Sequence, residues 1–169
     1  MVGKEGEGMD LERLLQEHGD SLYRMCVLYL KDEFLAQDAV QDTFLKAMTA
    51  SFRGECSEKT FLAGIAINVC RDYLRSPWRR RRAGPELLET ASAVPAPEPT
   101  DDTLPRAVMA LPGKYREVVV LYYYQELKAK EVAEALQLSL STVTVRLTRA
   151  RAMLKKKLKG WYYDDEQHA

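Results

Sequence analysis

A stretch rich in proline and acidic residues divides the chain and limits what it can fold into. Residues 83–105 hold five of the seven prolines, and residues 83–104 carry five carboxylates and no basic side chain. Such a sequence cannot bury a core and favours extended conformations. We therefore expect a flexible linker between two domains, with boundaries at 1–82 for the first domain, 83–103 for the linker, 104–160 for the second domain and 161–169 for a tail.

The first domain shows three helical patterns. Apolar residues recur at steps of three and four in a first stripe of Leu11, Leu14, Leu15, Leu22, Met25, Cys26 and Tyr29. A second stripe runs from Ala36 to Ala47 and a third from Leu62 to Tyr73. Ser76-Pro77 ends the third helix, because proline disfavours helix at the residue before it. These patterns predict a small three-helix bundle.

The second domain shows four helical patterns, over 104–111, 115–125, 128–136 and 141–159. The valine and tyrosine residues of 115–125 resemble a strand, but the segments around them favour a buried helix. A short helix, a tight turn at 137–140 and a longer basic helix predict a helix-turn-helix. The predicted fold is therefore all-α, with two small helical bundles joined by a flexible linker and a helix-turn-helix in the second.

The charges are segregated although the formal net charge is zero. Residues 68–82 hold six arginines against one aspartate, and residues 128–160 hold nine basic side chains against two acidic ones. Two basic blocks on either side of an acidic spacer indicate two contacts with a polyanion.

The last helix has an outward face suited to DNA. With 100° per residue, Val143 and Leu147 fall on a core side, whereas the opposite side carries Ser141, Val145, Thr148 and the flanking Thr144 and Arg149. Short hydroxyl side chains allow close approach to base edges, and a valine can contact a thymine methyl. Ser139 is the expected N-cap. The alternative interpretation is an amphipathic helix with a solvated basic face.

Two other helices have outward faces of different character. The third helix presents Gly64, Asn68, Arg71 and Arg75, which suit a nucleic-acid strand or are simply a solvated helix end. The second helix presents acidic groups around an exposed leucine, which favours docking on a basic groove of another protein; these residues are Asp38, Gln41, Asp42 and Leu45.

Composition excludes several classes of protein. No apolar run is long enough to span a membrane, and the acidic N-terminus is not a signal peptide. The three cysteines lack metal-ligand spacing, so we expect a reduced cytoplasmic protein with no metal and no cofactor. Two alternatives stay open: a dimeric helix-turn-helix repressor or response-regulator output domain, which explains only 104–160, and an enzyme that uses Cys56 or His18.

Four strings in this order resemble the extracytoplasmic-function group of bacterial sigma factors. They are LAQDAVQDTFLKA at 35–47, FLAGIAINVCRDYLR at 61–75, LPGKYREVVVLYYYQELKAKEVAEAL at 111–136 and STVTVRLTRARAMLKKKL at 141–158. The resemblance covers roughly 10–76, as sigma region two, and 104–158, as sigma region four. It implies a non-enzymatic protein that binds core RNA polymerase through the largest and second-largest subunits, directs promoter-specific initiation, takes no small-molecule substrate and is held inactive by an anti-sigma factor.

The resemblance also implies three sets of site residues. Those for polymerase docking are Asp38, Val40, Gln41, Asp42 and Phe44, with the outward Leu45. Those for the melted minus-ten element are Phe61, Asn68, Arg71, Asp72 and Arg75, beside a base-capturing loop at 53–60. Those for the minus-thirty-five element are Ser141, Thr142, Thr144, Val145, Thr148 and Arg149.

The chain departs from the family pattern at a few positions. Phe61 stands where tryptophan is frequent, and Val145 where a polar residue is frequent. Gln137 and Ser141 replace glycines of the turn and of the recognition-helix start. A non-glycine residue in a left-handed turn position costs about 1 kcal/mol, so we expect a slightly altered turn.

Overall fold

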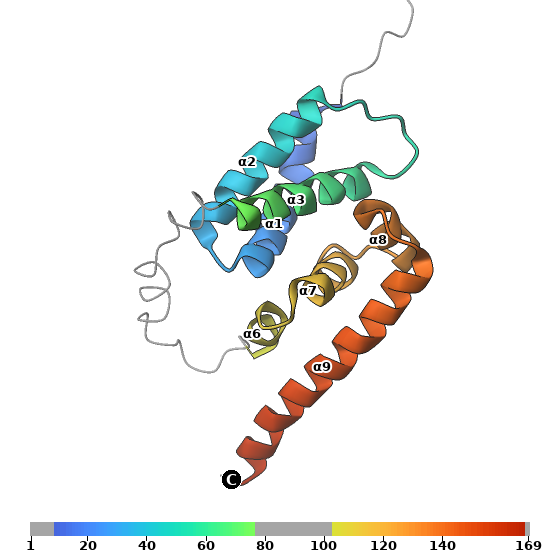
Figure 1. Ribbon diagram of the computed structural model, residues 1–169. Helices are drawn as coiled ribbons and strands as arrows, with labels where there is room; N and C mark the ends of the chain where they lie inside the picture. The colour runs from blue at the N-terminus through green and yellow to red at the C-terminus, as the bar shows by residue number, and fades with distance from the viewer. Residues whose placement is uncertain (1–8, 77–102, 168–169) are drawn as a thin grey trace, which may run out of the picture.

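The computed structural model describes residues 9–76 and 103–167, and every regular element in these ranges is a helix (Figure 1). The first bundle consists of α1 (Leu11–Leu30), α2 (Glu33–Thr49) and α3 (Glu58–Arg75). The second consists of α6 (Thr103–Met109), α7 (Gly113–Val119), the π-helix η1 (Val120–Tyr124), α8 (Ala129–Leu136) and α9 (Leu140–Gln167). The prediction of an all-α fold with two bundles is confirmed. The arginines at 79–82 and the linker before Thr103 lie outside the described residues.

Side-chain caps fix where the first three helices begin. Asp10, Asp32 and Ser57 each accept a hydrogen bond from the backbone N–H three residues ahead, over 3.1, 2.9 and 3.1 Å. Each cap satisfies one of the backbone donors that a helix start leaves without an intrahelical partner. The short connection from α1 to α2 passes through Lys31, whose φ of 59° is left-handed.

The core of the first bundle matches the predicted stripes with one exception. Leu14, Leu22 and Met25 are fully buried or nearly so. Cys26 and Cys70 are buried free thiols with their sulfur atoms 3.6 Å apart. Leu15, however, is 51% exposed, so its placement in the first stripe was wrong: it lies one residue, or 100°, round the helix from the buried Leu14.

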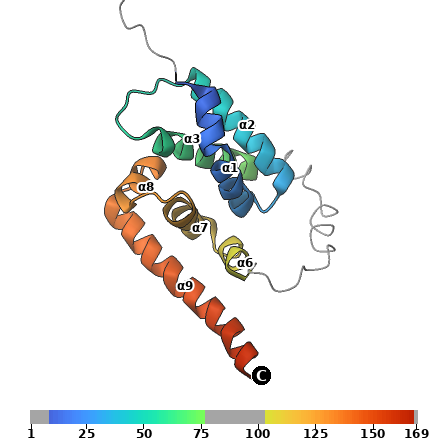
Figure 2. The same ribbon diagram turned by 180° about the vertical axis from the view of Figure 1, so that it is seen from behind.

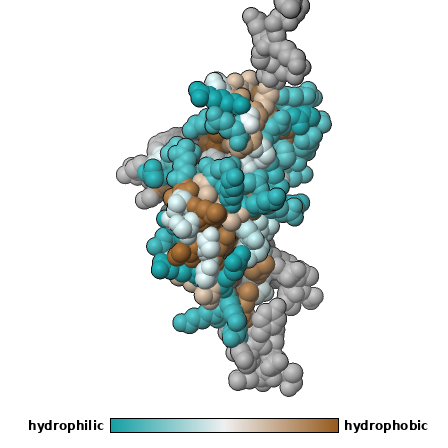
Figure 3. All heavy atoms as spheres, turned by 90° about the vertical axis from the view of Figure 1, so that its right-hand side faces the viewer, coloured by the Kyte–Doolittle hydropathy of each residue, from teal (hydrophilic) through white to brown (hydrophobic). Residues whose placement is uncertain are grey.

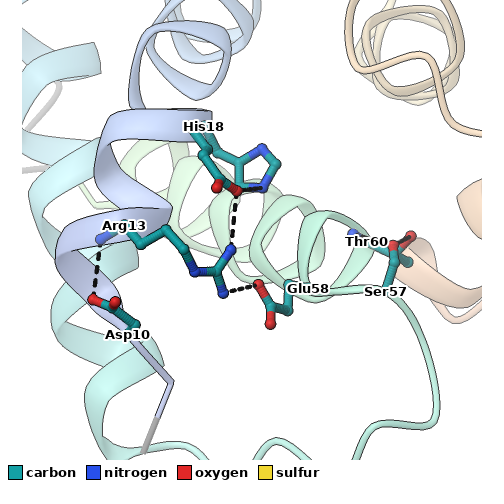
Figure 4. Close-up of polar contacts among 7 residues, drawn as sticks. Asp10, Arg13, His18, Ser57, Glu58 and Thr60 are labelled. Carbon is teal, nitrogen blue, oxygen red and sulfur yellow. Dashed lines mark hydrogen bonds and ion pairs between the residues drawn. The ribbon is translucent and has the colours of Figure 1, made fainter.

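An ion-pair cluster joins the start of α1 to the start of α3 (Figure 4). The Arg13 guanidinium donates to Glu17 over 3.0 Å and to Glu58 over 2.8 Å. The imidazole of His18 lies 3.8 Å from the same Glu17 carboxylate. These side chains are largely solvated, so the cluster orients the two helix starts and contributes little to stability.

In the second bundle, α9 packs its predicted inner stripe against α7. Val143, Leu147 and Ala150 are at most 3% exposed. The valine and tyrosine segment is helical, as expected, but it changes to π geometry at Val120. The backbone N–H of Gln125 donates to the Val120 carbonyl over 3.0 Å and closes this turn. α9 extends to Gln167, beyond the predicted end at 159, because each residue added to an existing helix gains one backbone hydrogen bond.

The two bundles lie against each other (Figures 1 and 2). α3 packs on α8, and α1 packs on η1 and α6. Gly64 of α3 permits a close approach: a Cβ there would sit 3.2 Å from the carbonyl oxygen of Ala135 in α8. The sequence predicted a tether and gave no indication of this packing.

Within 9–76 and 103–167, none of the helices is long and apolar enough to cross a membrane. Figure 3 shows a face on which hydrophilic residues surround a smaller hydrophobic area.

Candidate nucleic-acid interface

The start of α9 presents the residues that the sequence placed outward. The hydroxyl of Ser139 accepts a hydrogen bond from the Thr142 amide over 3.2 Å, which confirms the predicted N-cap. Thr142 is half-buried, and the rest of the predicted reading face is exposed: Ser141, Thr144, Val145, Thr148 and Arg149. The predicted orientation of this helix is therefore confirmed, while the contacts of these residues with DNA remain predictions.

Two of the three threonines on this face donate their hydroxyl protons to the helix backbone. Thr144 donates its hydroxyl proton to the Leu140 carbonyl over 2.9 Å, and Thr148 donates to the Thr144 carbonyl over 3.0 Å. A hydroxyl whose proton is engaged in this way still accepts hydrogen bonds. In the major groove the complementary donors are the amino groups of adenine and cytosine.

A hollow of about 320 Å³ lies beside the reading face, between α7 and α9. Lys114 and Tyr115 line its α7 side, and Arg149 lines its α9 side. The hydrogen bond from Arg149, together with the charge of nearby Lys114, lowers the pKa of Tyr115. Sequence analysis missed Lys114 and Tyr115, because only the tertiary fold brings α7 beside the recognition helix. Two cations around a hydroxyl suit a backbone phosphate.

The turn between α8 and α9 contains the strained residue that the departure from the family pattern indicated. Gln137 has φ 55° and ψ 44°, in the left-handed region. The next amide, of Leu138, donates to the Ala133 carbonyl over 3.0 Å, so this conformation closes the end of α8.

We expect Gln137→Gly to stabilise the protein. Relieving the left-handed strain gains about 1–2 kcal/mol, and the added flexibility of the unfolded chain offsets about 0.4–1 kcal/mol of that. The net gain of up to about 1.6 kcal/mol is measurable as a higher urea midpoint with an unchanged slope. Gln16→Gly is the opposing control, because it places glycine inside α1 and should destabilise. A lower midpoint for Gln137→Gly would contradict this reading of the turn.

The outward face of α3 is only partly free. Asn68, Asp72 and Arg75 are exposed. Phe61 is half-buried, and its ring centroid lies 5.0 Å from that of Phe52 in the preceding loop. Arg71 differs from the other three polar residues, because its guanidinium contacts the second bundle.

Arg71 forms a two-pronged ion pair with Glu117 of α7. Its Nε and Nη2 donate to the two carboxylate oxygens, each over 2.7 Å. The pKa of Arg71 is raised, chiefly by these hydrogen bonds. The hydroxyl of Tyr29 also donates to Glu117, over 2.7 Å, and its pKa is raised by burial and then by this carboxylate. The prediction that Arg71 is outward and solvated is therefore wrong in this arrangement, because its half-buried guanidinium pairs with Glu117.

α2 exposes half of the six predicted docking residues. Asp38 and Gln41 are exposed, and Leu45 and Met48 are 59% and 63% exposed. The other predicted docking residues are half-buried: Val40, Asp42 and Phe44. Asp42 accepts a hydrogen bond from the Tyr73 hydroxyl, which joins α2 to α3. Asp42 is therefore a packing residue as well as a candidate contact.

The thiol of Cys56, one of the two side chains that suggested an enzyme, is poorly activated. Burial, followed by the neighbouring carboxylates of Glu134, Glu55 and Glu131, raises the pKa of Cys56, which disfavours the reactive thiolate. In the described part of the chain, no three acidic, histidine or cysteine side chains cluster as metal ligands do.

An apolar groove that sequence analysis missed runs between α6, η1 and α9. Its volume is about 590 Å³. Leu104, Val108 and Leu154 lie among its lining residues, and Arg151 and Lys155 bring positive charge to it. The guanidinium of Arg151 donates to the Tyr123 hydroxyl over 2.6 Å. A groove of this composition suits the apolar side of an acidic amphipathic helix.

The known proteins that this chain resembles are sigma factors of RNA polymerase. The sigma-70 region 2 family matches residues 14–80, and the sigma-70 region 4 family matches residues 101–154. The chain is 30% identical to the ECF RNA polymerase sigma factor SigM of Mycobacterium tuberculosis over 155 residues, which cover 90% of this chain and 79% of SigM.

Two solved structures resemble the fold. CnrH, in complex with the cytosolic domain of CnrY, is 30% identical with a TM-score of 0.66, covering 89% of this chain and 88% of CnrH. The sigma factor RpoE of Bartonella quintana, in complex with the anti-sigma factor NepR, is 23% identical with a TM-score of 0.67, covering 89% and 97% of the two chains. At that identity the second likeness concerns the fold alone.

Proposed function

This chain belongs to the extracytoplasmic-function sigma factors of RNA polymerase, and from that premise we propose how its parts divide promoter recognition. The N-terminal domain, 1–82, docks on core polymerase through α2 and holds the unpaired minus-ten strand along α3. The C-terminal domain, 104–160, reads the minus-thirty-five duplex with α9, and 83–103 connects them. The observation that carries this proposal is the exposed reading face at the start of α9, within the segment that matches sigma region 4.

The minus-ten site combines the three kinds of contact that a single strand needs. The paired rings of Phe52 and Phe61 border the 53–60 loop, where a flipped base stacks or inserts. Asn68 offers an amide to a base edge, and Arg75 offers charge to a phosphate. These contacts offset the few kcal/mol that unstacking a base step costs.

Neither bundle binds DNA strongly by itself. Linking two weak sites raises affinity only when their spacing fits the target. Core polymerase sets that spacing. The protein without polymerase therefore binds promoters poorly.

An anti-sigma protein is the second protein partner. Two exposed apolar surfaces are suited to bind this partner: the α2 face around Leu45 and the groove between α6, η1 and α9. CnrH is held in complex with a partner's cytosolic domain. A protein that covers both surfaces here would keep the sigma factor from polymerase.

Reconstitution tests this function. Bacterial core polymerase with the purified protein should start transcripts at new sites on genomic DNA, and sequencing their 5′ ends should reveal two shared upstream elements. A gel shift without polymerase should give weak binding. A dimeric repressor would instead bind alone, at half-sites one helical turn apart. Unchanged start sites and no association with core polymerase would contradict the proposal.

A further inference from the structure

Glu117 is a buried carboxylate whose partners come from the other bundle. It is 5% exposed on α7. In the described part of the chain, the donors that reach it are Arg71 of α3 and Tyr29 of α1. A buried carboxylate without partners costs several kcal/mol. Arg71 and Tyr29 satisfy the Glu117 carboxylate only while the two bundles touch.

Other polar contacts cross the same interface. Gln125, fully buried, donates from Nε2 to the Ser21 carbonyl over 2.9 Å and to its hydroxyl over 2.8 Å. Thr60 of α3 donates to Glu131 of α8 over 3.2 Å. Within the residues described, Gln125 Oε1 and Arg116 Nε are buried without a hydrogen-bond partner. An interface with such polar content resembles those between domains that separate.

The interface covers part of one predicted DNA-binding face, at Arg71 and Gly64, and leaves the other face open. Arg71 cannot offer its Nε–Nη2 edge to Glu117 and to a phosphate at once, and Gly64, one turn before Asn68, lies under α8. The reading face of α9, by contrast, remains exposed. The contact therefore acts on the predicted minus-ten surface selectively.

We propose that Glu117 is an internal counter-ion that captures Arg71 and holds the protein in an autoinhibited, closed form. This inference rests on the proposed role of α3 in binding the melted strand. Glu117 accepts the hydrogen bonds that Arg71 would otherwise donate to a phosphate of the strand. Separation of the two bundles frees the Arg71 guanidinium. Docking of each bundle at its own place on polymerase supplies that separation.

Two variants open the interface by independent means. Glu117→Gln removes the charge that holds Arg71. Gly64→Leu inserts a side chain where even a Cβ would lie 3.2 Å from the carbonyl oxygen of Ala135, so α3 and α8 must part. Leucine is a better helix former than glycine, so α3 persists. Glu134→Gln, which changes an exposed carboxylate of α8, is the matched control for charge.

The full-length variants are compared by small-angle X-ray scattering and by binding of a fluorescein-labelled strand of twelve deoxythymidines. Opening should raise the radius of gyration by roughly 4 Å, the difference between one compact body and two tethered ones. If about one molecule in ten is open in the wild type, both opened variants should bind the strand about tenfold more tightly. Glu134→Gln should change neither quantity. Adding Arg71→Gln to Glu117→Gln should abolish the gain in affinity.

Unchanged scattering and affinity in both opened variants would overturn the proposal. So would opening without tighter binding, because Arg71 would then not be the captured group. Promoter-specific transcription by the wild type in the same preparations separates these failures from failure of the sigma-factor assignment.

Discussion

Leu45→Glu should weaken binding to core polymerase by about ten- to a hundredfold, because burying a leucine side chain contributes about 1.5–3 kcal/mol and the glutamate would be desolvated instead. Leu45 is 59% exposed in the free protein, and glutamate is a good helix former, so the bundle itself should stay folded. Fluorescence anisotropy of the labelled protein titrated with core polymerase measures the affinity, and circular dichroism checks the helix content.

The matched control for this variant is Leu15→Glu. Leu15 is 51% exposed and lies on α1 of the same bundle, and it is not among the predicted docking residues. The same loss of affinity in both variants would indicate a general effect of charge or stability. Full affinity in Leu45→Glu would remove α2 from the docking site. Asp42 is a poor choice for this test, because its bond from Tyr73 gives it a structural role.

Local periodicity was enough to predict the bundles and the recognition helix. The stripe of Val143, Leu147 and Ala150 is buried as expected, since residues three and four apart share one helix face. The Ser139 cap followed from the chemistry of a few neighbouring residues, whereas the left-handed Gln137 followed from the resemblance to a family that often has glycine there. Helix faces and caps depend on residues only a few positions apart, so they can be predicted from one sequence.

Features set by contacts distant in sequence were not predictable. Arg71 and Glu117 are 46 residues apart, and each alone resembles a solvated charge on a helix. The pairing of Lys114 and Tyr115 with the α9 face depends on how α7 crosses α9. The spacing of apolar residues predicts which side of a helix is buried, but not which helix will cover it.

Arg149→Ala should lower promoter occupancy by the polymerase holoenzyme about 10- to 100-fold, because a two-pronged contact with a base contributes about 1–3 kcal/mol. Arg149 is exposed on the α9 face, so its loss should leave the fold intact. Footprinting at one promoter over a range of holoenzyme concentrations measures the effect. Arg106→Ala, an exposed arginine of the same domain on α6, should have little effect.

Changing the DNA as well as the protein separates base reading from charge. If Arg149 reads a base, altering that base pair should cost the wild type about tenfold or more in occupancy and cost Arg149→Ala almost nothing. If Arg149 only neutralises a phosphate, every sequence should weaken equally, and the slope of log affinity against log salt should fall by about one. Unchanged occupancy in Arg149→Ala on all sequences would exclude both roles. The paired comparison therefore shows which interaction the exposed guanidinium makes, because a base contact depends on one base pair and a phosphate contact does not.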